Sequence, residues 1–178
     1  MAVYPYLFCQ DRQPESNYLV FPRHSSENRT YIPIGFISPS VIVGDACSIV
    51  PNASLYEFGL LTSIVHNYWL KVVSGRIKSD FRYSPSTYNN FPRVQASSAQ
   101  IDSITKTAQS ILDARALYPD SSLADLYDPL TMPPELRKAH QANDKAVIAA
   151  YGWDKDITEE EIVANLMQMY AEKTKEEA

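Results

Sequence analysis

The pattern of apolar and polar positions predicts short strands joined by turns in the first part of the chain. Up to about residue 50, β-branched and aromatic runs alternate with prolines and glycines, a pattern typical of strands and turns. We expect strands at residues 18–21, 30–36, 41–43 and 48–50. Pro33 lies inside the second run, and because it has no amide hydrogen it restricts that strand to a sheet edge or a bulge.

From residue 54 the pattern changes to that of a helix. Apolar residues recur at steps of three and four up to residue 74, which predicts one helix over residues 54–74. Asn52 or Ser54 can cap its start, and Gly75 suits its end. Polar and apolar residues then alternate strictly over residues 76–83. We expect a strand there, with one face made by Arg76, Lys78, Asp80 and Arg82.

The second part of the chain is expected to be helical. An apolar stripe runs over residues 101–112 and ends before Pro119. Ser122 and Asp125 have the spacing of a capping box, and Thr158 with Glu161 repeats it before the last helix. A longer helix is expected between Pro134 and Gly152.

The predicted fold class is α+β, with a mixed strand-and-helix domain over residues 1–94 and a small all-α helical domain over residues 95–178. The two parts also differ in charge. The chain carries a net charge of −5, but residues 1–94 hold eight basic and six acidic residues and residues 95–178 hold eight and fifteen. Any polyanion is therefore expected to contact the first part.

Several functional classes are disfavoured by composition. No apolar run is long enough to span a membrane, and the start of the chain does not resemble a signal peptide. Two cysteines, Cys9 and Cys47, give neither a disulfide framework nor zinc-site spacing, which favours a cytoplasmic protein. His24, His66 and His140 lie far apart in the sequence, and we expect the last two to be structural or exposed helical residues.

The chain also contains no glycine-rich phosphate loop. We therefore expect no catalytic residues, no metal and no cofactor in this chain. A complete small enzyme remains the weakest alternative, because no catalytic constellation supports it.

The alternating segment suggests a specific chemistry. A Lys or Arg side chain donates to guanine in the major groove, and an Asp accepts from the amino group of the paired cytosine. Lys78 with Asp80 can therefore read one G·C pair, and Arg23 with Asp45 can form a second couple. The competing interpretation is that these charged side chains lie on an exposed sheet face and contact only solvent.

Six ordered segments resemble the C-terminal portion of the MmeI-like type IIL restriction–modification enzymes and related DNA methyltransferases, from about residue 4 to residue 170. They are Asn-Tyr-Leu-Val-Phe-Pro at 17–22, Ser-Ser-Glu-Asn-Arg-Thr-Tyr-Ile-Pro-Ile-Gly-Phe at 25–36, Pro-Asn-Ala-Ser-Leu-Tyr-Glu-Phe-Gly at 51–59, Gly-Arg-Ile-Lys-Ser-Asp-Phe-Arg-Tyr-Ser at 75–84, Tyr-Asn-Asn-Phe-Pro at 88–92 and Leu-Ala-Asp-Leu-Tyr-Asp-Pro-Leu-Thr-Met-Pro-Pro at 123–134.

In that family an upstream domain binds S-adenosylmethionine and methylates adenine, and many members also carry an N-terminal nuclease. The catalytic motif Asn-Pro-Pro-Tyr or Phe is absent from these 178 residues. The resemblance therefore implies a target-recognition domain and a C-terminal helical domain. Their expected partners are duplex DNA and the upstream methyltransferase domain, with no membrane.

The resemblance also implies roles for individual residues. Lys78 and Asp80 correspond to the pair that reads the base just after the methylated adenine. Arg23 and Asp45 correspond to the pair that reads the base two before it.

Ala46 and Arg82 correspond to positions that read the intervening base, where this combination suggests a purine. The implied inner target is thus G-purine-A-G. Contacts to the DNA backbone are expected from Arg29, Arg76, Asn89 and Asn90. The alternative function is a protein-interaction module that docks on other parts of a restriction–modification complex.

Overall fold

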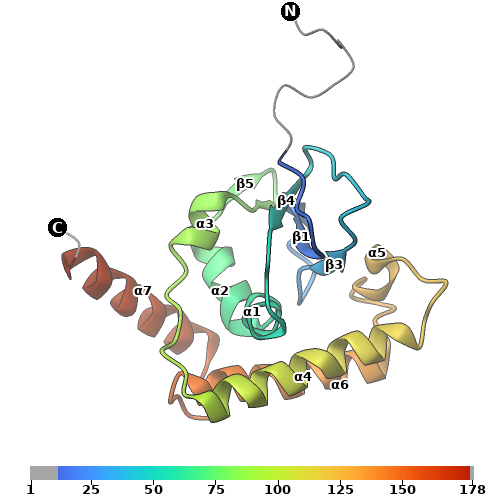
Figure 1. Ribbon diagram of the computed structural model, residues 1–178. Helices are drawn as coiled ribbons and strands as arrows, with labels where there is room; N and C mark the ends of the chain where they lie inside the picture. Colours follow the sequence, from blue (N-terminus) through green and yellow to red (C-terminus); the bar gives the residue numbers. More distant parts are fainter. Residues whose placement is uncertain (1–11, 177–178) are drawn as a thin grey trace, which may run out of the picture.

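Two small antiparallel sheets share one continuous chain segment in the computed structural model, which describes residues 12–176 (Figure 1). The first sheet has the order β3-β1-β4 and the second has the order β2-β6-β5. Their strands are β1 (Tyr18–Pro22), β2 (His24–Ser25), β3 (Gly35–Ile37), β4 (Cys47–Val50), β5 (Gly75–Ile77) and β6 (Asp80–Arg82). Only Arg23 separates β1 from β2, so residues 18–25 contribute to both sheets.

Helices pack beside and beneath the sheets (Figure 1). They are α1 (Leu55–Leu61), α2 (Ile64–Val73), α3 (Pro85–Asn89), α4 (Ser98–Ala116), α5 (Leu123–Leu126), α6 (Pro134–Ala150) and α7 (Glu159–Glu176). The long helices α4 and α6 run side by side beneath α1, and α5 and α7 lie at opposite ends of that pair (Figure 1). The predicted α+β class is confirmed.

Both hydrophobic cores contain residues from the two parts of the chain. In the first core, Leu19 and Phe58 pack with Ile111 and Leu136 of the helical part. In the second core, the first part contributes Trp69 and Phe91, and the helical part contributes Ile104 and Leu166. Because burial of apolar surface drives folding, each part depends on the other for its interior.

Two neighbouring polar residues of α6 also join the parts. Asn143 Nδ2 donates to the carbonyl oxygen of Gly59 over 2.8 Å. The Asp144 carboxylate accepts hydrogen bonds from the Tyr31 hydroxyl at 2.6 Å and from the Ile64 amide at 2.8 Å. Burial raises the pKa of Asp144 to about 6.

The helix predicted over residues 54–74 is interrupted, so that prediction was wrong in its continuity. α1 ends at Leu61, and Ser63 caps a new helix by accepting from the His66 amide. The apolar residues keep a helical spacing across this break, so the pattern gave no sign of it. Ser54 caps the first helix, as one of the two predicted candidates.

Two of the predicted strands are also revised. Residues 41–43 form no strand, and the carbonyl oxygen of Val41 accepts from side chains, including Gln13 Nε2 at 2.8 Å. Ile42 remains 65% exposed. Of residues 30–36, only the end pairs in a sheet, as part of β3. The Ile34 amide instead bonds locally to the carbonyl oxygen of Ile32, on the other side of Pro33.

The helical part agrees more closely with its prediction. Capping boxes form at Ser122–Asp125 and at Thr158–Glu161, and Gly152 follows α6 with a φ of 74°. The short helix α3 was not predicted. The apolar start of the chain and Cys9 lie outside the described range, while Cys47 is half-buried and free.

Candidate functional site

The segment predicted as one strand over residues 76–83 is a β-hairpin. β5 and β6 pair with Arg76 opposite Phe81 and Ile77 opposite Asp80, which leaves Lys78 and Ser79 as the loop. Lys78 has a φ of 57°, and positive φ values are characteristic of two-residue hairpin loops. The loop contains none of the Asn or Gly residues that usually mark such a turn. The alternation of polar and apolar residues therefore indicated one continuous strand.

The hairpin changes which side chains share a face, because residues directly opposite one another in antiparallel strands point to the same side. Arg76 lies on the side of Phe81 and Ser25, whose side chains are buried. The expectation that Arg76 shares a face with Asp80 and Arg82 was therefore wrong. The opposite side, here called the outer face, consists of His24, Gly75, Ile77, Asp80 and Arg82, all exposed.

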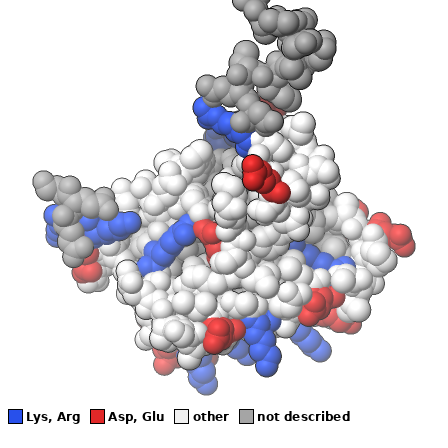
Figure 2. All heavy atoms as spheres, viewed as in Figure 1, with Lys and Arg blue, Asp and Glu red and all other residues white. Residues whose placement is uncertain are grey.

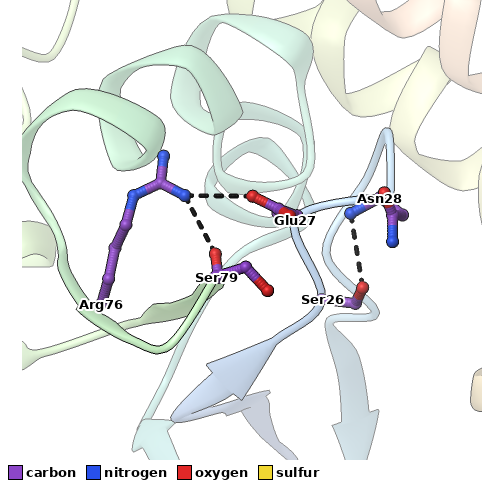
Figure 3. Close-up of polar contacts among 5 residues, drawn as sticks. All are labelled: Ser26, Glu27, Asn28, Arg76 and Ser79. Atoms are coloured by element: carbon purple, nitrogen blue, oxygen red, sulfur yellow. Dashed lines mark hydrogen bonds and ion pairs between the residues drawn. The ribbon is translucent and has the colours of Figure 1, made fainter.

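Arg76 links the β5–β6 hairpin to the turn at residues 26–29 (Figure 3). Its Nη1 donates to the Ser79 carbonyl oxygen over 2.9 Å and lies 3.3 Å from Glu27 Oε2. Its guanidinium also lies 4.6 Å from the centre of the Phe81 ring. Arg29 follows in the same turn, where its amide donates to the carbonyl oxygen of Ser26 over 3.2 Å.

A second group of predicted residues meets where the two sheets join. The Arg23 amide donates to the Ala46 carbonyl oxygen, and Arg23 Nη1 donates to the Asp45 carbonyl oxygen, each over 2.9 Å. The carbonyl oxygen of Arg23 accepts from the amide of Tyr83, the residue after Arg82, over 2.8 Å. The fold thus brings Arg23, Asp45 and Ala46 next to the end of β6, although Ala46 and Arg82 are 36 positions apart in the sequence.

Four charged side chains on and beside the outer face have no partner among the described residues. Within residues 12–176, no hydrogen bond or ion pair engages the side chains of Lys78, Asp80 or Arg82, or the Asp45 carboxylate. Arg76 and Arg93 differ, because Arg93 pairs with Glu57 at 3.0 Å and lies over the Tyr88 ring. Donors and acceptors near the outer face are therefore available to a ligand.

The two asparagines predicted to contact a DNA backbone lie on the next element. Asn89 ends α3 and Asn90 caps it, and both are exposed. Only Tyr83 and Ser84 separate β6 from α3, so these asparagines are joined directly to the hairpin.

The buried histidines are structural, as predicted for helical residues. His66 Nε2 hydrogen-bonds with the Tyr83 hydroxyl at 3.0 Å, and His140 Nε2 with the Tyr127 hydroxyl at 2.6 Å. Burial lowers the pKa of His66 to about 4 and the pKa of His140 to about 3. Both imidazoles are therefore neutral near pH 7.

Residues 12–176 contain no cluster of three His, Cys, Asp or Glu residues that could hold a metal ion. Over the same residues, no helix is both long and apolar enough to cross a membrane. A cavity of about 720 Å³ lies between the end of α3 and α7, and its walls include Asn89, Arg93 and Glu172. Its lining among the described residues includes no glycine, and Arg93 there pairs with Glu57.

Charges of both signs alternate over the surface seen in Figure 2. In that view Lys and Arg lie among Asp and Glu along the region of α4 and α6, and the centre of the view is mostly uncharged. No single-sign patch dominates this side.

Comparisons with known proteins agree over nearly the whole chain. The family described as MmeI, target recognition domain, matches residues 1–95, and the family described as MmeI, C-terminal domain, matches residues 96–177. A relative, DNA methyltransferase A of Bacillus subtilis (strain 168), is 38% identical over 176 residues, which is 98% of this chain and 20% of the relative. A solved structure of the type IIL restriction–modification enzyme MmeI in complex with DNA superposes with a TM-score of 0.88 at 48% identity, and the match covers 92% of this chain and 22% of that one. The chain thus spans about a fifth of the length of these two proteins.

Proposed function

The chain belongs to the MmeI family as a target recognition domain followed by the C-terminal domain, and from this premise we propose that it reads a specific sequence in duplex DNA. The similar structure of MmeI was solved in complex with DNA. In this proposal the chain selects the site, and a methyltransferase domain elsewhere in a longer protein modifies an adenine within it. Phosphate contacts would set the register and base contacts would choose the sequence.

The outer face and its surroundings carry the proposal most directly. Lys78 projects from the tip of the hairpin and Asp80 follows on the outer face, both without an internal partner among the described residues. A donor and an acceptor at this spacing suit the guanine and the cytosine of one base pair. Arg23 and Asp45 form the second donor–acceptor couple, where the sheets join.

In this proposal Arg82 reads the intervening base. The small side chain of Ala46, whose carbonyl oxygen accepts from the Arg23 amide, would leave room for that contact. We propose the inner target G-purine-A-G on this basis. Arg29, Asn89 and Asn90 remain candidates for phosphate contacts. Arg76 is a further candidate for a phosphate contact, and its guanidinium already hydrogen-bonds to Glu27 and Ser79.

Catalysis would belong to the rest of the longer protein. The chain lacks the Asn-Pro-Pro motif and a glycine-rich loop, so in this proposal S-adenosylmethionine binds elsewhere in the longer protein. Adenine methylation and a cytoplasmic location are parts of the proposal that concern that longer protein.

A protein-docking role has one observation in its favour. Leu117 and Leu130 are 63% and 93% exposed in the segments that connect α4 to α6. Contact with another domain would remove the apolar surface of these leucines from water. This second function is compatible with DNA recognition, because it uses the helical part of the chain.

Binding to duplex DNA tests the proposed function. The 178-residue chain should bind duplexes with an affinity that falls as salt concentration rises, because phosphate contacts release counterions. Arg82→Gln should weaken binding to the preferred duplex by about 5- to 150-fold, the range expected for a good base contact. The matched control Arg137→Gln, an exposed arginine of α6, should bind as the unchanged chain does. Salt-independent binding, or equal losses for the two variants, would contradict the proposal.

A further inference from the structure

We propose that His24 is a further specificity-determining residue, which acts beside Arg82 on the same base and allows that base to be either purine. The inference rests on the proposed function, because it deepens the role of the outer face. No sequence pattern assigned a role in base reading to His24, whereas its neighbour Arg23 was predicted to read a base.

The strand register places the two side chains together. His24 of β2 lies directly opposite Arg82 of β6, so both point out from the outer face. The Cβ atoms of such cross-strand neighbours lie about 4.5–5.5 Å apart. Gly75 of β5 is the neighbour of Arg82 on the other side, and nothing lies within 4 Å of the position that a Cβ would occupy there. Of the two cross-strand neighbours of Arg82, His24 is therefore the one that has a side chain.

The fold does not require the imidazole of His24. The other two histidines are buried and hydrogen-bond with tyrosines. By contrast, His24 is exposed, and no described residue makes a hydrogen bond or ring contact with its side chain. An exposed imidazole beside an unpaired guanidinium is available for a shared ligand.

The chemistry of the two side chains is complementary on a purine. Arginine only donates, and the N7 atom that adenine and guanine share can accept from it. The neighbouring position differs between the bases, because guanine presents the acceptor O6 and adenine presents the donor N6. A neutral imidazole has one donor and one acceptor nitrogen. His24 can therefore satisfy either purine, whereas a second arginine would favour guanine.

Three substitutions separate these hydrogen-bonding roles. In the 178-residue chain, His24→Asp leaves only an acceptor and should favour adenine. His24→Lys leaves only a donor and should favour guanine, and His24→Asn keeps both roles and should accept either base. The readout is the ratio of affinities for two duplex pools that contain G-A-A-G or G-G-A-G within random flanks. We expect the ratio to shift about fivefold or more in opposite directions for Asp and Lys.

Controls make the outcomes distinct. Gln141 is exposed on α6, so Gln141→Asp and Gln141→Lys introduce the same charges without changing the ratio. If the unchanged chain selects the target but the ratio is the same in all His24 variants, this inference is overturned and the proposed function stands. If the unchanged chain has no sequence preference in duplex DNA, both are overturned.

Discussion

Gly59 marks a close approach between α1 and the helical part of the chain. A Cβ at this position would lie 2.6 Å from Ile104 Cγ2 and 3.1 Å from both Ala108 Cβ and Asn143 Oδ1. These neighbours are buried and cannot easily move. We expect Gly59→Ala to lower the free energy of unfolding by about 1–3 kcal/mol, the usual cost of overpacking.

Urea denaturation of Gly59→Ala and of Gly44→Ala would measure this effect. Nothing lies within 4 Å of a Cβ at Gly44, which is exposed, so the second variant should match the unchanged chain. Equal free energies of unfolding for the two variants would show that α1 and α4 do not pack this closely.

Single residues of the candidate site were predictable where their chemistry is local. Lys78, Asp80 and Arg82 are charged positions in a short segment, and their exposure follows from the cost of burying charge. His24 could not be identified in the same way, because its significance lies in its pairing with Arg82, a residue far along the chain. A strand register of this kind is a tertiary property that no sequence pattern here records.

At the scale of elements, the tip of the β5–β6 hairpin has an unfavourable backbone conformation. Lys78 adopts a left-handed conformation with a φ of 57°, which is unfavourable for a residue with a Cβ atom and is tolerated by glycine. Lys78→Gly should therefore raise the free energy of unfolding by up to about 1 kcal/mol while it weakens selection of G after the target adenine. Thermal denaturation together with duplex selection would measure both effects.

Ser79→Gly is the matched control for that variant. Ser79 occupies the same loop without a positive φ, so glycine there should only add freedom to the unfolded chain and lower stability. Stabilisation by both substitutions, or by neither, would contradict the assigned conformation of the loop.

Elements were predictable where periodicity and capping coincide. The long helices α4, α6 and α7 follow from apolar stripes bounded by capping residues and by Gly152. The break between α1 and α2 and the hairpin at Lys78 were missed for one shared reason. In both places the apolar spacing continues through the turn, and the turn is fixed by tertiary contacts such as the Ile64 amide with Asp144.

At the scale of the whole molecule, the response of residues 12–176 to acid depends on the buried groups His66, His140 and Asp144. Burial lowers the pKa values of His66 and His140 to about 4 and about 3, below the unfolded value of about 6.5. Their contribution is present above pH ~6.5 and is lost as pH falls. The pKa of Asp144 is raised to about 6, so its contribution runs the other way and is lost as pH rises through that value.

Between pH ~6 and ~4, the unfolded chain gains two protons on the histidines, and the folded chain gains one on Asp144. The free energy of unfolding should therefore fall by roughly 1 kcal/mol per pH unit on acidification. Denaturant titrations at several pH values would measure this slope. Asp144→Asn removes the opposing group and should make the slope steeper, whatever its effect on stability at pH 7. A free energy of unfolding that rises on acidification would contradict the neutral, buried state of the histidines.

The central claim is that the hairpin and its surroundings read bases, and exchanging one donor with one acceptor tests it most directly. Lys78→Glu with Asp80→Arg reverses the couple and preserves the net charge. The control Lys155→Glu with Asp156→Lys reverses an exposed ion pair in the helical part.

Selection of duplexes from a random pool by the 178-residue chain is the measurement. The unchanged chain and the control should select G after the target adenine, and the Lys78–Asp80 exchange should select C there with the other positions unchanged. If the exchanged chain still selects G, the hairpin does not read that base and its charges only face solvent.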